Sequence, residues 1–256
     1  MAGVAMCEVL VAVWPEPQPF SRVLPWGLKL ERLGIGGFGW GLAWREGDGI
    51  RRHRNPGPLS RDHKGQAELA EVSSTHFLLH LRRPSKLSTV AMADTQPFVS
   101  DDGSFSFAHN GRLALADQLR DRFPGRLFGR ADSEVGFRLF AELLGGGMEG
   151  GAALAEVHRQ MGGNANLAYL PARGQALFYA GNPQNDVWCF RLDGAECAST
   201  ALHSADQALF DLCFPAATDR VRLAPTQVTS LGEGTRAHLE DGAVAVGGGR
   251  EGVELQ

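Results

Sequence analysis

The stretch Met6–Trp14, which reads MCEVLVAVW, decides how the rest of this sequence is interpreted. Its residues after the cysteine are mostly valine, leucine and alanine, and Pro15 ends the run. A short apolar run rich in β-branched residues and stopped by proline is typical of a buried β-strand. Cys7 lies directly before that strand and directly after a methionine. It is either one more core side chain or a nucleophile at the first position of a chain that begins at Met6.

Outside this stretch, the composition is that of an ordinary globular protein. The chain has 256 residues, 43% of them hydrophobic and 21% charged, which is enough for one large domain with a substantial core. Its 25 basic and 29 acidic residues give a formal net charge of −4, so we expect no nucleic-acid partner and no binding to an anionic membrane. No apolar stretch approaches the roughly 20 residues of a transmembrane helix.

The cysteines and the N-terminal residues indicate a cellular compartment. The first 14 residues lack the basic start and the long apolar middle of a signal peptide. None of the four cysteines forms a C-x-x-C pair, and four in a chain of this length are no dense disulfide framework. We therefore expect a cytoplasmic protein with free thiols and no metal site. The cysteines are Cys7, Cys189, Cys197 and Cys213.

Strand and helix signals come in blocks along the chain. Apolar residues at helical spacing follow Asp132-Ser133 and end at Gly145–Gly147, and a second helical segment ends at Gly162-Gly163. Strands, then helices, then strands favour an α+β fold of mainly antiparallel sheets over a doubly wound parallel sheet. A short helix is expected around residues 205–214 and a hairpin at residues 237–246. The other strand-like runs are residues 40–44, 76–81, 104–108, 166–170, 176–180 and 187–192.

Several local motifs have an ordinary structural explanation when each is taken alone. Gly34–Gly39 matches G-x-G-x-x-G, but a strand follows it where a dinucleotide-binding loop needs a helix, so we expect a plain loop. Asn110-Gly111 is a common hairpin turn, Arg82 a solvated strand end, and Asp132 a helix N-cap. The basic run Arg51–Arg54 is expected to be a solvated loop.

The order of six motifs changes these interpretations. The motifs are Met6-Cys7-Glu8, Gly39-Trp40-Gly41, His80-Leu81-Arg82, Thr95-x-Pro97-Phe98, Ala108-His109-Asn110-Gly111 and Asp132-Ser133-Glu134. In this order they resemble the class II glutamine amidotransferases, which are N-terminal-nucleophile hydrolases, and most of all the stand-alone, single-domain branch. The match spans about residues 6–144, and the strands of residues 164–192 are similar more loosely.

The resemblance implies a fold and a domain arrangement. The fold is an α+β, four-layer α-β-β-α sandwich of two mainly antiparallel sheets. A single domain is expected over residues 7–246, with residues 1–6 a leader or an over-called start and residues 247–256 a frayed tail. No cofactor and no metal is implied.

The chemistry of an N-terminal cysteine explains the Met6-Cys7 pair. A thiol has a reference pKa of about 8.5 and an α-amino group one of about 7.7–8.0. If Cys7 is the first residue, its own amine can take the thiol proton and later return a proton to leaving ammonia. A peptide nitrogen has no such basicity. Removal of the methionine would therefore complete the nucleophile.

The resemblance also assigns roles to other residues. The Asn110 side-chain N–H and the Gly111 backbone N–H correspond to the oxyanion hole, which stabilises charge on the attacked carbonyl oxygen. Arg82 corresponds to the arginine that grips the substrate α-carboxylate with a bidentate fork, and Asp132 to the carboxylate that holds the α-ammonium. Residues expected to support the same cleft are Trp40, Gly41, His80 and His109.

The implied reaction is hydrolysis of a γ-glutamyl amide, glutamine by default, with ammonia released or passed to a synthase partner. Phe38, the glycine-free segment Arg83–Ser88, and Asp94 in place of asparagine depart from many relatives and leave the γ-glutamyl substrate open. Two alternatives remain. One is a γ-glutamyl hydrolase acting on a larger thiol metabolite, and the other is a non-catalytic binding module whose Cys7 is blocked by the leader.

Overall fold

The computed structural model describes residues 7–34, 37–84, 87–200 and 207–232. Within them, the strands form two sheets in which all neighbouring strands are antiparallel. Sheet A has the order β11 (Thr218–Arg222), β9 (Val187–Leu192), β10 (Ala195–Thr200), β1 (Glu8–Pro19), β4 (Ser73–Leu81), β2 (Trp40–Glu46) and β3 (Gly49–Asn55). Sheet B has the order β12 (Val228–Leu231), β8 (Ala176–Tyr179), β7 (Gly163–Pro171), β6 (Phe105–Leu113) and β5 (Phe98–Val99).

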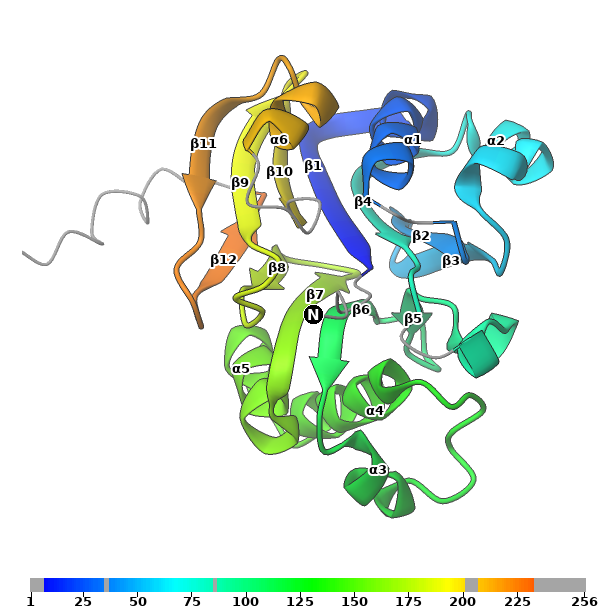
Figure 1. The fold of residues 1–256 in the computed structure, drawn as a ribbon, viewed down its shortest axis with the longest axis vertical. Helices are drawn as coiled ribbons and strands as arrows, with labels where there is room; N and C mark the ends of the chain where they lie inside the picture. The colour runs from blue at the N-terminus through cyan, green and yellow to red at the C-terminus, as the bar shows by residue number, and fades with distance from the viewer. Residues whose placement is uncertain (1–6, 35–36, 85–86, 201–206, 233–256) are drawn as a thin grey trace, which may run out of the picture.

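Helices cover the outer faces of both sheets, so the fold has four layers (Figure 1). One apolar cluster lies between sheet A and the helices α1 (Leu24–Leu33), α2 (His63–Leu69) and α6 (Gln207–Cys213). A second lies between sheet B and the helices α3 (Ala116–Leu119), α4 (Asp132–Gly145) and α5 (Gly150–Met161). A third lies between the two sheets. The expected sandwich of two antiparallel sheets with helices is confirmed.

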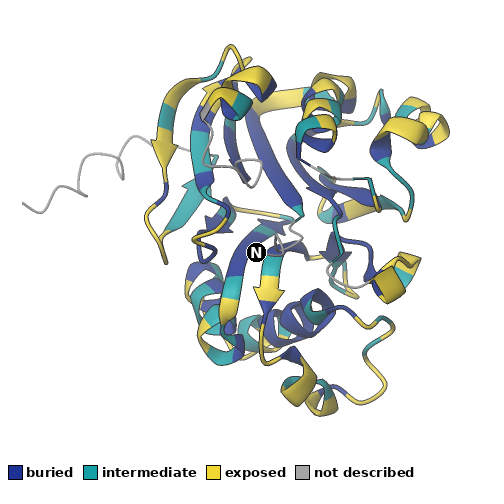
Figure 2. Ribbon diagram, viewed as in Figure 1, coloured by how far each residue is buried: buried dark blue, intermediate teal, exposed yellow. Residues whose placement is uncertain are grey.

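Strand β1 lies in the middle of sheet A and is buried on both faces (Figure 2). Leu10 and Ala12 face the helices, whereas Val9 and Val11 face sheet B. Alternate side chains of a strand point to opposite faces, so a strand covered on both sides needs apolar residues at every position. This burial is the physical reason for the unbroken apolar run of residues 9–14 after Glu8.

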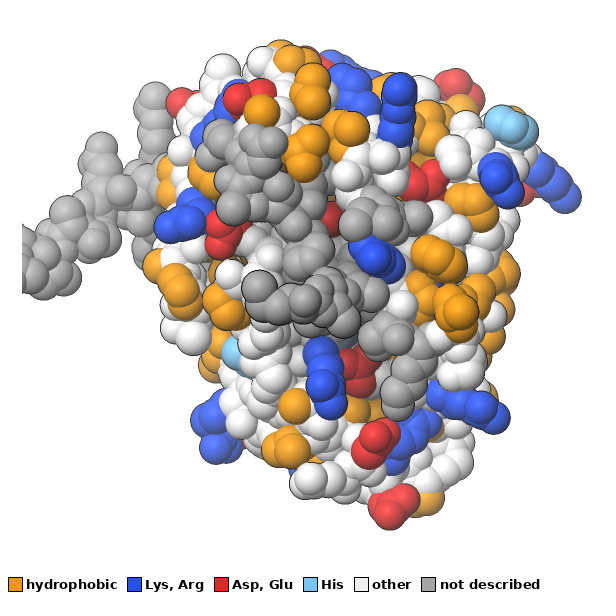
Figure 3. Space-filling model, in the orientation of Figure 1, with side chains coloured by type: hydrophobic (Ala, Val, Ile, Leu, Met, Phe, Trp, Pro, Cys, Tyr) orange, Lys and Arg blue, Asp and Glu red, His pale blue; other side chains and the backbone are white. Residues whose placement is uncertain are grey.

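Short 3-10 turns occur between these elements. They are η1 (Phe20–Arg22), η2 (Leu59–Arg61), η3 (Leu87–Thr89), η4 (Met92–Asp94) and η5 (Arg120–Arg122). In the described part of the chain, every helix is too short or too polar to cross a bilayer. On the face shown in Figure 3, the described basic and acidic side chains are interspersed rather than gathered in patches of one sign.

Most of the expected elements are present, but several others were not predicted, among them α2, α3, β5, β11 and β12. Helix α1 was not predicted, and β1 continues beyond Pro15 to Pro19 after a register shift. The basic run Arg51–Arg54 was expected to be a loop, but it lies in β3, an edge strand of sheet A. The hairpin expected at residues 237–246, the leader and the tail lie outside the described residues.

The glycine-rich segment Gly34–Gly39 follows a helix and precedes a strand. Helix α1 ends at Leu33 and β2 begins at Trp40. A dinucleotide-binding loop has the reverse arrangement, with a strand before it and a helix N-terminus after it. The expectation of a plain connecting loop agrees with these flanking elements.

Candidate active site

Cys7 lies at the start of β1, beside the end of β4. Glu8 pairs with Leu81 in the β1–β4 register, and the Cys7 sulfur accepts a hydrogen bond from the backbone N–H of Arg83 at 3.3 Å. Burial raises the pKa of the Cys7 thiol to about 11, although the charge of Arg82 and the Arg83 N–H act in the opposite direction. The thiol is therefore neutral at neutral pH, and it needs a base before it can attack a carbonyl.

Asn110 and Gly111 lie within β6, opposite β7, and not in a hairpin turn. The Asn110 Nδ2 donates a hydrogen bond to the backbone carbonyl of Cys7. Gly111 has a φ of 120°, and a Cβ there would lie 2.0 Å from the carbonyl oxygen of Asn164. Only glycine fits such a position. Strand β6 thus brings the two expected oxyanion-hole residues to the end of β1 next to Cys7.

Arg82 follows β4 and is 3% exposed. Its Nη1 donates to the carbonyl oxygen of Asp94, and its Nη2 donates to both the carbonyl oxygen and the Oγ1 of Thr89, each at 2.8 Å. Its Nε has no hydrogen-bond partner among the described residues. Because both hydrogens of Nη2 are used, no two adjacent N–H groups are left for a forked contact with a carboxylate. The guanidinium holds the η3–η4 segment, which differs from the expected bidentate grip.

Two carboxylates hold the segment that leads into α4. Asp94 accepts hydrogen bonds from the backbone N–H groups of residues 130 and 131, each at 2.6 Å. Glu134 accepts one from the N–H of Gly129 at 2.7 Å. Since Asp94 also supplies the carbonyl that Arg82 contacts, η4 and the start of α4 form one connected polar structure beside Arg82.

Asp132 is the first residue of α4, whose N-cap is Ala131. Its Oδ2 accepts a hydrogen bond from the N–H of Leu113 at 2.8 Å, at the end of β6. The charge of Asp132 raises the pKa of the Cys7 thiol, so the carboxylate is within electrostatic reach of the Cys7 sulfur. A cationic group bound between Asp132 and Cys7 would therefore lie close to the negative charge of the Asp132 carboxylate.

Gly41 makes room for a segment that links the two sheets. A Cβ at Gly41 would lie 2.2 Å from the carbonyl oxygen of Gln96. The Gln96 side chain donates to the carbonyl of His109 at 3.1 Å and accepts from its N–H at 2.6 Å. Gly41 of sheet A and His109 of sheet B are thus connected through one residue.

His80 and His109 are buried, neutral imidazoles. His80 lies opposite Val9 and Gly41 in sheet A, and Val9 belongs to the cluster between the sheets, so the His80 ring points toward sheet B. Burial lowers the pKa of His80 well below its ordinary value and also lowers that of His109, and the nearby charge of Arg82 acts in the same direction. These side chains support the region around Arg82 as neutral groups.

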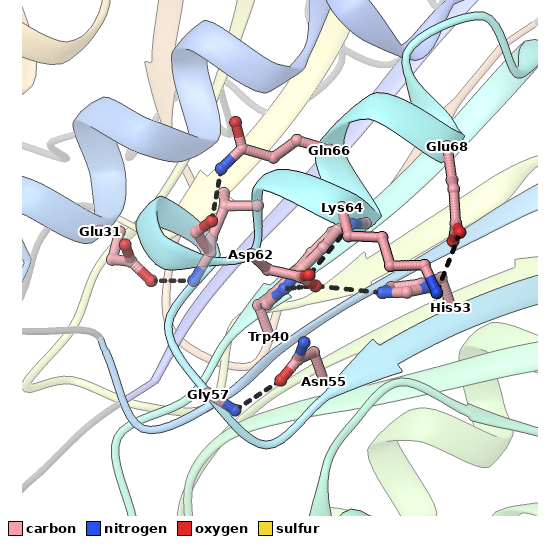
Figure 4. A network of polar contacts seen from close by, with 11 residues as sticks. Glu31, Trp40, His53, Asn55, Gly57, Asp62, Lys64, Gln66 and Glu68 are labelled. Carbon is pink, nitrogen blue, oxygen red and sulfur yellow. Dashed lines mark hydrogen bonds and ion pairs between the residues drawn. The ribbon is translucent and has the colours of Figure 1, made fainter.

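Trp40 lies on the opposite face of sheet A and does not line this site. Its ring packs on Phe20, with 6.3 Å between centroids, and its Nε1 donates to Asp62 at 3.1 Å. Asp62 also accepts the N–H of Gly65 at the start of α2 and lies 3.4 Å from His53 Nε2 (Figure 4). We expected Trp40 to support the catalytic cleft. Instead, through its hydrogen bond to Asp62, it stabilises the packing of α2 and β3 at the outer face of sheet A.

A family comparison agrees with this arrangement of residues. The profile of a family described as glutamine amidotransferases class-II matches residues 31–209. The chain belongs to this family. No curated protein matches the sequence.

Solved structures similar to this chain share its fold. Glutamine phosphoribosylpyrophosphate amidotransferase from B. subtilis, complexed with ADP and GMP, has a TM-score of 0.68 and 18% identity, with 89% of this chain covered. The chain spans about half of that protein, 47% of its length. A glutamine aminotransferase class-II domain protein from Silicibacter pomeroyi has a TM-score of 0.59 and 16% identity, with 89% of this chain and 95% of that one covered.

Some buried polar residues near the candidate site were not singled out from the sequence. Gln96 and the asparagines Asn166, Asn182 and Asn185 are buried close to the expected site residues. Asn166 does carry a signal, because a lone asparagine inside the apolar strand NLAYL must find hydrogen-bond partners when it is buried. Among the described residues, no group of three or more His, Cys, Asp and Glu side chains is placed to hold a metal ion.

Proposed function

We propose that this protein hydrolyses a γ-glutamyl amide, glutamine by default, through a thioester on Cys7. The observation that carries the proposal is the position of Cys7 at the start of a central strand, with the Asn110 amide on its carbonyl and the Arg83 N–H on its sulfur. The family and the fold support hydrolysis or transfer of the glutamine amide nitrogen.

The proposed reaction begins with Cys7 as the first residue of the mature chain. Its α-amine takes the thiol proton, and the sulfur adds to the γ-carbonyl carbon of glutamine. Asn110 Nδ2 and the Gly111 N–H donate hydrogen bonds to the oxygen of the tetrahedral intermediate. The amine then returns the proton to the departing nitrogen, the C–N bond breaks, and ammonia leaves. Water attacks the thioester and releases glutamate and the free thiol.

Arg82 and Asp132 are proposed to hold the two charges of the substrate head group. The N–H groups of Arg82 that η3 and η4 leave unused lie on Nε and Nη1, so they supply single contacts to the α-carboxylate rather than a fork. Asp132 presents its carboxylate to the α-ammonium from the start of α4. The opposite effects of these two charges on the pKa of the Cys7 thiol support this assignment.

Three further points belong to the same proposal. Residues 1–6 are a leader or an over-called start and are absent from the active form, and residues 7–246 act as one domain. Ammonia passes to a synthase partner or to solvent. The reaction takes place in the cytoplasm, where the four free thiols of this chain would stay reduced.

Ammonia release from glutamine tests the proposal directly. The form that begins at Cys7 should release ammonia, and Cys7→Ala should abolish the release. Cys189→Ala, a matched change of another free thiol, should keep it. Activity that survives Cys7→Ala would overturn the proposal. Hydrolysis of a larger γ-glutamyl thiol compound without hydrolysis of glutamine would keep the mechanism and change the substrate.

A further inference from the structure

Buried asparagine side chains stand behind Asn110, on the side away from Cys7. Asn166 lies directly opposite Asn110 in the β6–β7 register and is 1% exposed. Its Nδ2 donates to the Asn110 Oδ1 at 2.9 Å and to the carbonyl oxygen of Asn185 at 2.7 Å. The Asn182 Nδ2 lies 3.4 Å from the same Asn110 Oδ1. The Asn110 oxygen is therefore held by donors from two other residues.

Backbone groups determine which way the Asn166 amide faces. Its Oδ1 accepts hydrogen bonds from the N–H of Gly181 at 3.1 Å and from the N–H of Asn182 at 3.0 Å. A backbone N–H can only donate, so the oxygen of Asn166 must face these two groups and its NH₂ must face Asn110. If the Asn166 amide were reversed, its NH₂ would face the N–H groups of Gly181 and Asn182, and its oxygen would face the carbonyl oxygen of Asn185. Such buried mismatches are costly.

The orientation of Asn110 follows from that of Asn166. Its oxygen faces Asn166, so its Nδ2 faces the Cys7 carbonyl and the space next to the nucleophile. A half-turn of the Asn110 amide would present an oxygen to the attacked carbonyl, and the negative charge that develops there would be repelled. An oxyanion hole works because its donors are aligned before the reaction.

We propose that Asn166 is a positioning residue for the reaction. It transmits the fixed direction of the 181–182 backbone to Asn110, so that the Asn110 N–H rather than its oxygen meets the substrate oxyanion. This inference rests on the proposed function, and it adds a residue that touches neither the substrate nor Cys7.

Asn166→Asp tests the inference with nearly no change in shape. The carboxylate keeps the two bonds from the backbone and loses the donor to Asn110, which then turns its own NH₂ toward residue 166. We expect kcat to fall by about 10²- to 10³-fold, the loss typical of removing one oxyanion-hole donor, with little change in KM. Asn164→Asp makes the same change two positions earlier on β7, outside this set of asparagines, and should leave kcat unchanged.

A double-mutant cycle separates positioning from a general structural role. If Asn166 acts through Asn110, then Asn166→Asp should cost little further kcat in an Asn110→Ala background. Multiplicative losses, or a wild-type kcat for Asn166→Asp alone, would overturn the inference. If Asn166→Asp does not fold, Asn166→Ser serves in the same cycle, because serine is too short to reach Asn110.

The pH profile of the variant supplies a second readout. A buried aspartic acid has a raised pKa, and its protonated form can donate to the Asn110 Oδ1 as the native NH₂ does. The ratio of variant to wild-type kcat should therefore rise as the pH falls from about 8 to about 5.5. The titratable groups on the elements packed around this position are present in both enzymes, so the variant adds only the carboxyl of residue 166; they are Cys7, His109, Asp132, His158 and Tyr179. A constant ratio would contradict the inference.

An NMR measurement keeps this inference independent of the proposed function. The Asn110 side-chain amide protons should show cross-relaxation to Cys7 in the wild-type protein and to residue 166 in Asn166→Asp. Unchanged contacts would overturn the inference. A wild-type protein that releases no ammonia would overturn the proposed function instead, and the NMR result would then decide the orientation of Asn110 by itself.

Discussion

The two sides of the candidate site are built in different ways. On the side of the oxyanion hole, Asn110 and Asn166 lie on paired strands and are 0% and 1% exposed. On the side of Arg82, the contacts come from the short turns η3 and η4, where Leu87 is 73% exposed. Figure 2 shows the same contrast between the buried central strands and the more exposed turns beside them. In the proposed function, the chemistry therefore takes place where the backbone is held by two neighbouring strands, and substrate recognition takes place beside turns that can adapt.

The largest effect on the strand side should come from the first residue of the chain. A form that begins at Cys7 has a free amine beside the thiol, whereas a form that keeps residues 1–6 has a peptide nitrogen there. Loss of one positioned acid–base group costs roughly 10²- to 10⁴-fold in rate, so the longer form should be nearly inert. Ammonia release by the two purified forms, with their first residues checked by mass, measures the difference. If the two forms release ammonia at the same rate, the α-amine of Cys7 is not the base in the reaction.

Gly41→Ala should damage both sides at once, because Gln96 connects them. The new Cβ would lie 2.2 Å from the Gln96 carbonyl oxygen, so the backbone must move. We expect a loss of about 1–3 kcal/mol in the free energy of unfolding and a fall in kcat of up to about 10²-fold, with a higher KM. Urea unfolding and steady-state kinetics measure these changes. Gly145→Ala, at the end of α4, is the control: its Cβ would meet nothing within 4 Å, so it should leave kcat and KM unchanged and should not lower the free energy of unfolding. A Gly41→Ala protein with only KM changed would mean that Gln96 does not support β6.

Arg82→Lys should affect the loop side alone. Lysine keeps the charge but cannot repeat the three hydrogen bonds to Thr89 and Asp94. We expect KM for glutamine to rise by about 10-fold, kcat to change little, and amide exchange in residues 87–95 to become faster. Arg51→Lys, in an exposed pair with Glu46, is the matched control. If KM does not change, a cation other than Arg82 binds the α-carboxylate of the substrate.

Trp40→Phe should have the smallest effect on catalysis, because this ring lies on the far face of sheet A. The change removes the hydrogen bond to Asp62 and part of a buried ring. We expect a loss of about 1–3 kcal/mol in the free energy of unfolding, with kcat and KM close to the wild-type values. Thermal unfolding and steady-state kinetics of the same preparation measure both. A selective loss of kcat would mean that the outer layer of sheet A does influence the catalytic side.

The elements that the sequence missed share a physical cause, which is that packing overrides local preference. Helix α1 contains Gly27 in its interior, a residue that lowers helix propensity. A Cβ at Gly27 would lie 2.7 Å from a methyl group of Leu79, so close packing on β4 requires the glycine. Strand β3 is an edge strand in which Arg51 and Arg52 are exposed and Arg54 is half-buried, and its sequence lacks the apolar alternation that marks a half-buried strand.

The candidate site was predictable where its residues form local motifs and not where it depends on distant contacts. Cys7, Asn110 and Asp132 each stand in a short recognisable stretch, and the structure brings them together. The role of Arg82 in holding η3 and η4 depends on backbone carbonyls, which have no sequence signature. The Asn110–Asn166 bond joins residues 56 positions apart, and only the pairing of β6 with β7 reveals it.

The position of β1 in sheet A also determines when this strand can complete its pairing during protein synthesis. The N–H of Val9 donates a hydrogen bond to the Oγ1 of Thr200 at 3.1 Å across 191 positions of sequence. Strand β1 therefore cannot pair with β10 until nearly 200 residues have been synthesised. At about 5–20 residues per second, a ribosome needs roughly 10 to 40 s to supply that partner. During this interval β1 lacks its β10 neighbour, so an aminopeptidase can reach the start of the chain. If Cys7 acts as proposed, the order of synthesis therefore provides a period in which residues before it can be removed ahead of complete folding.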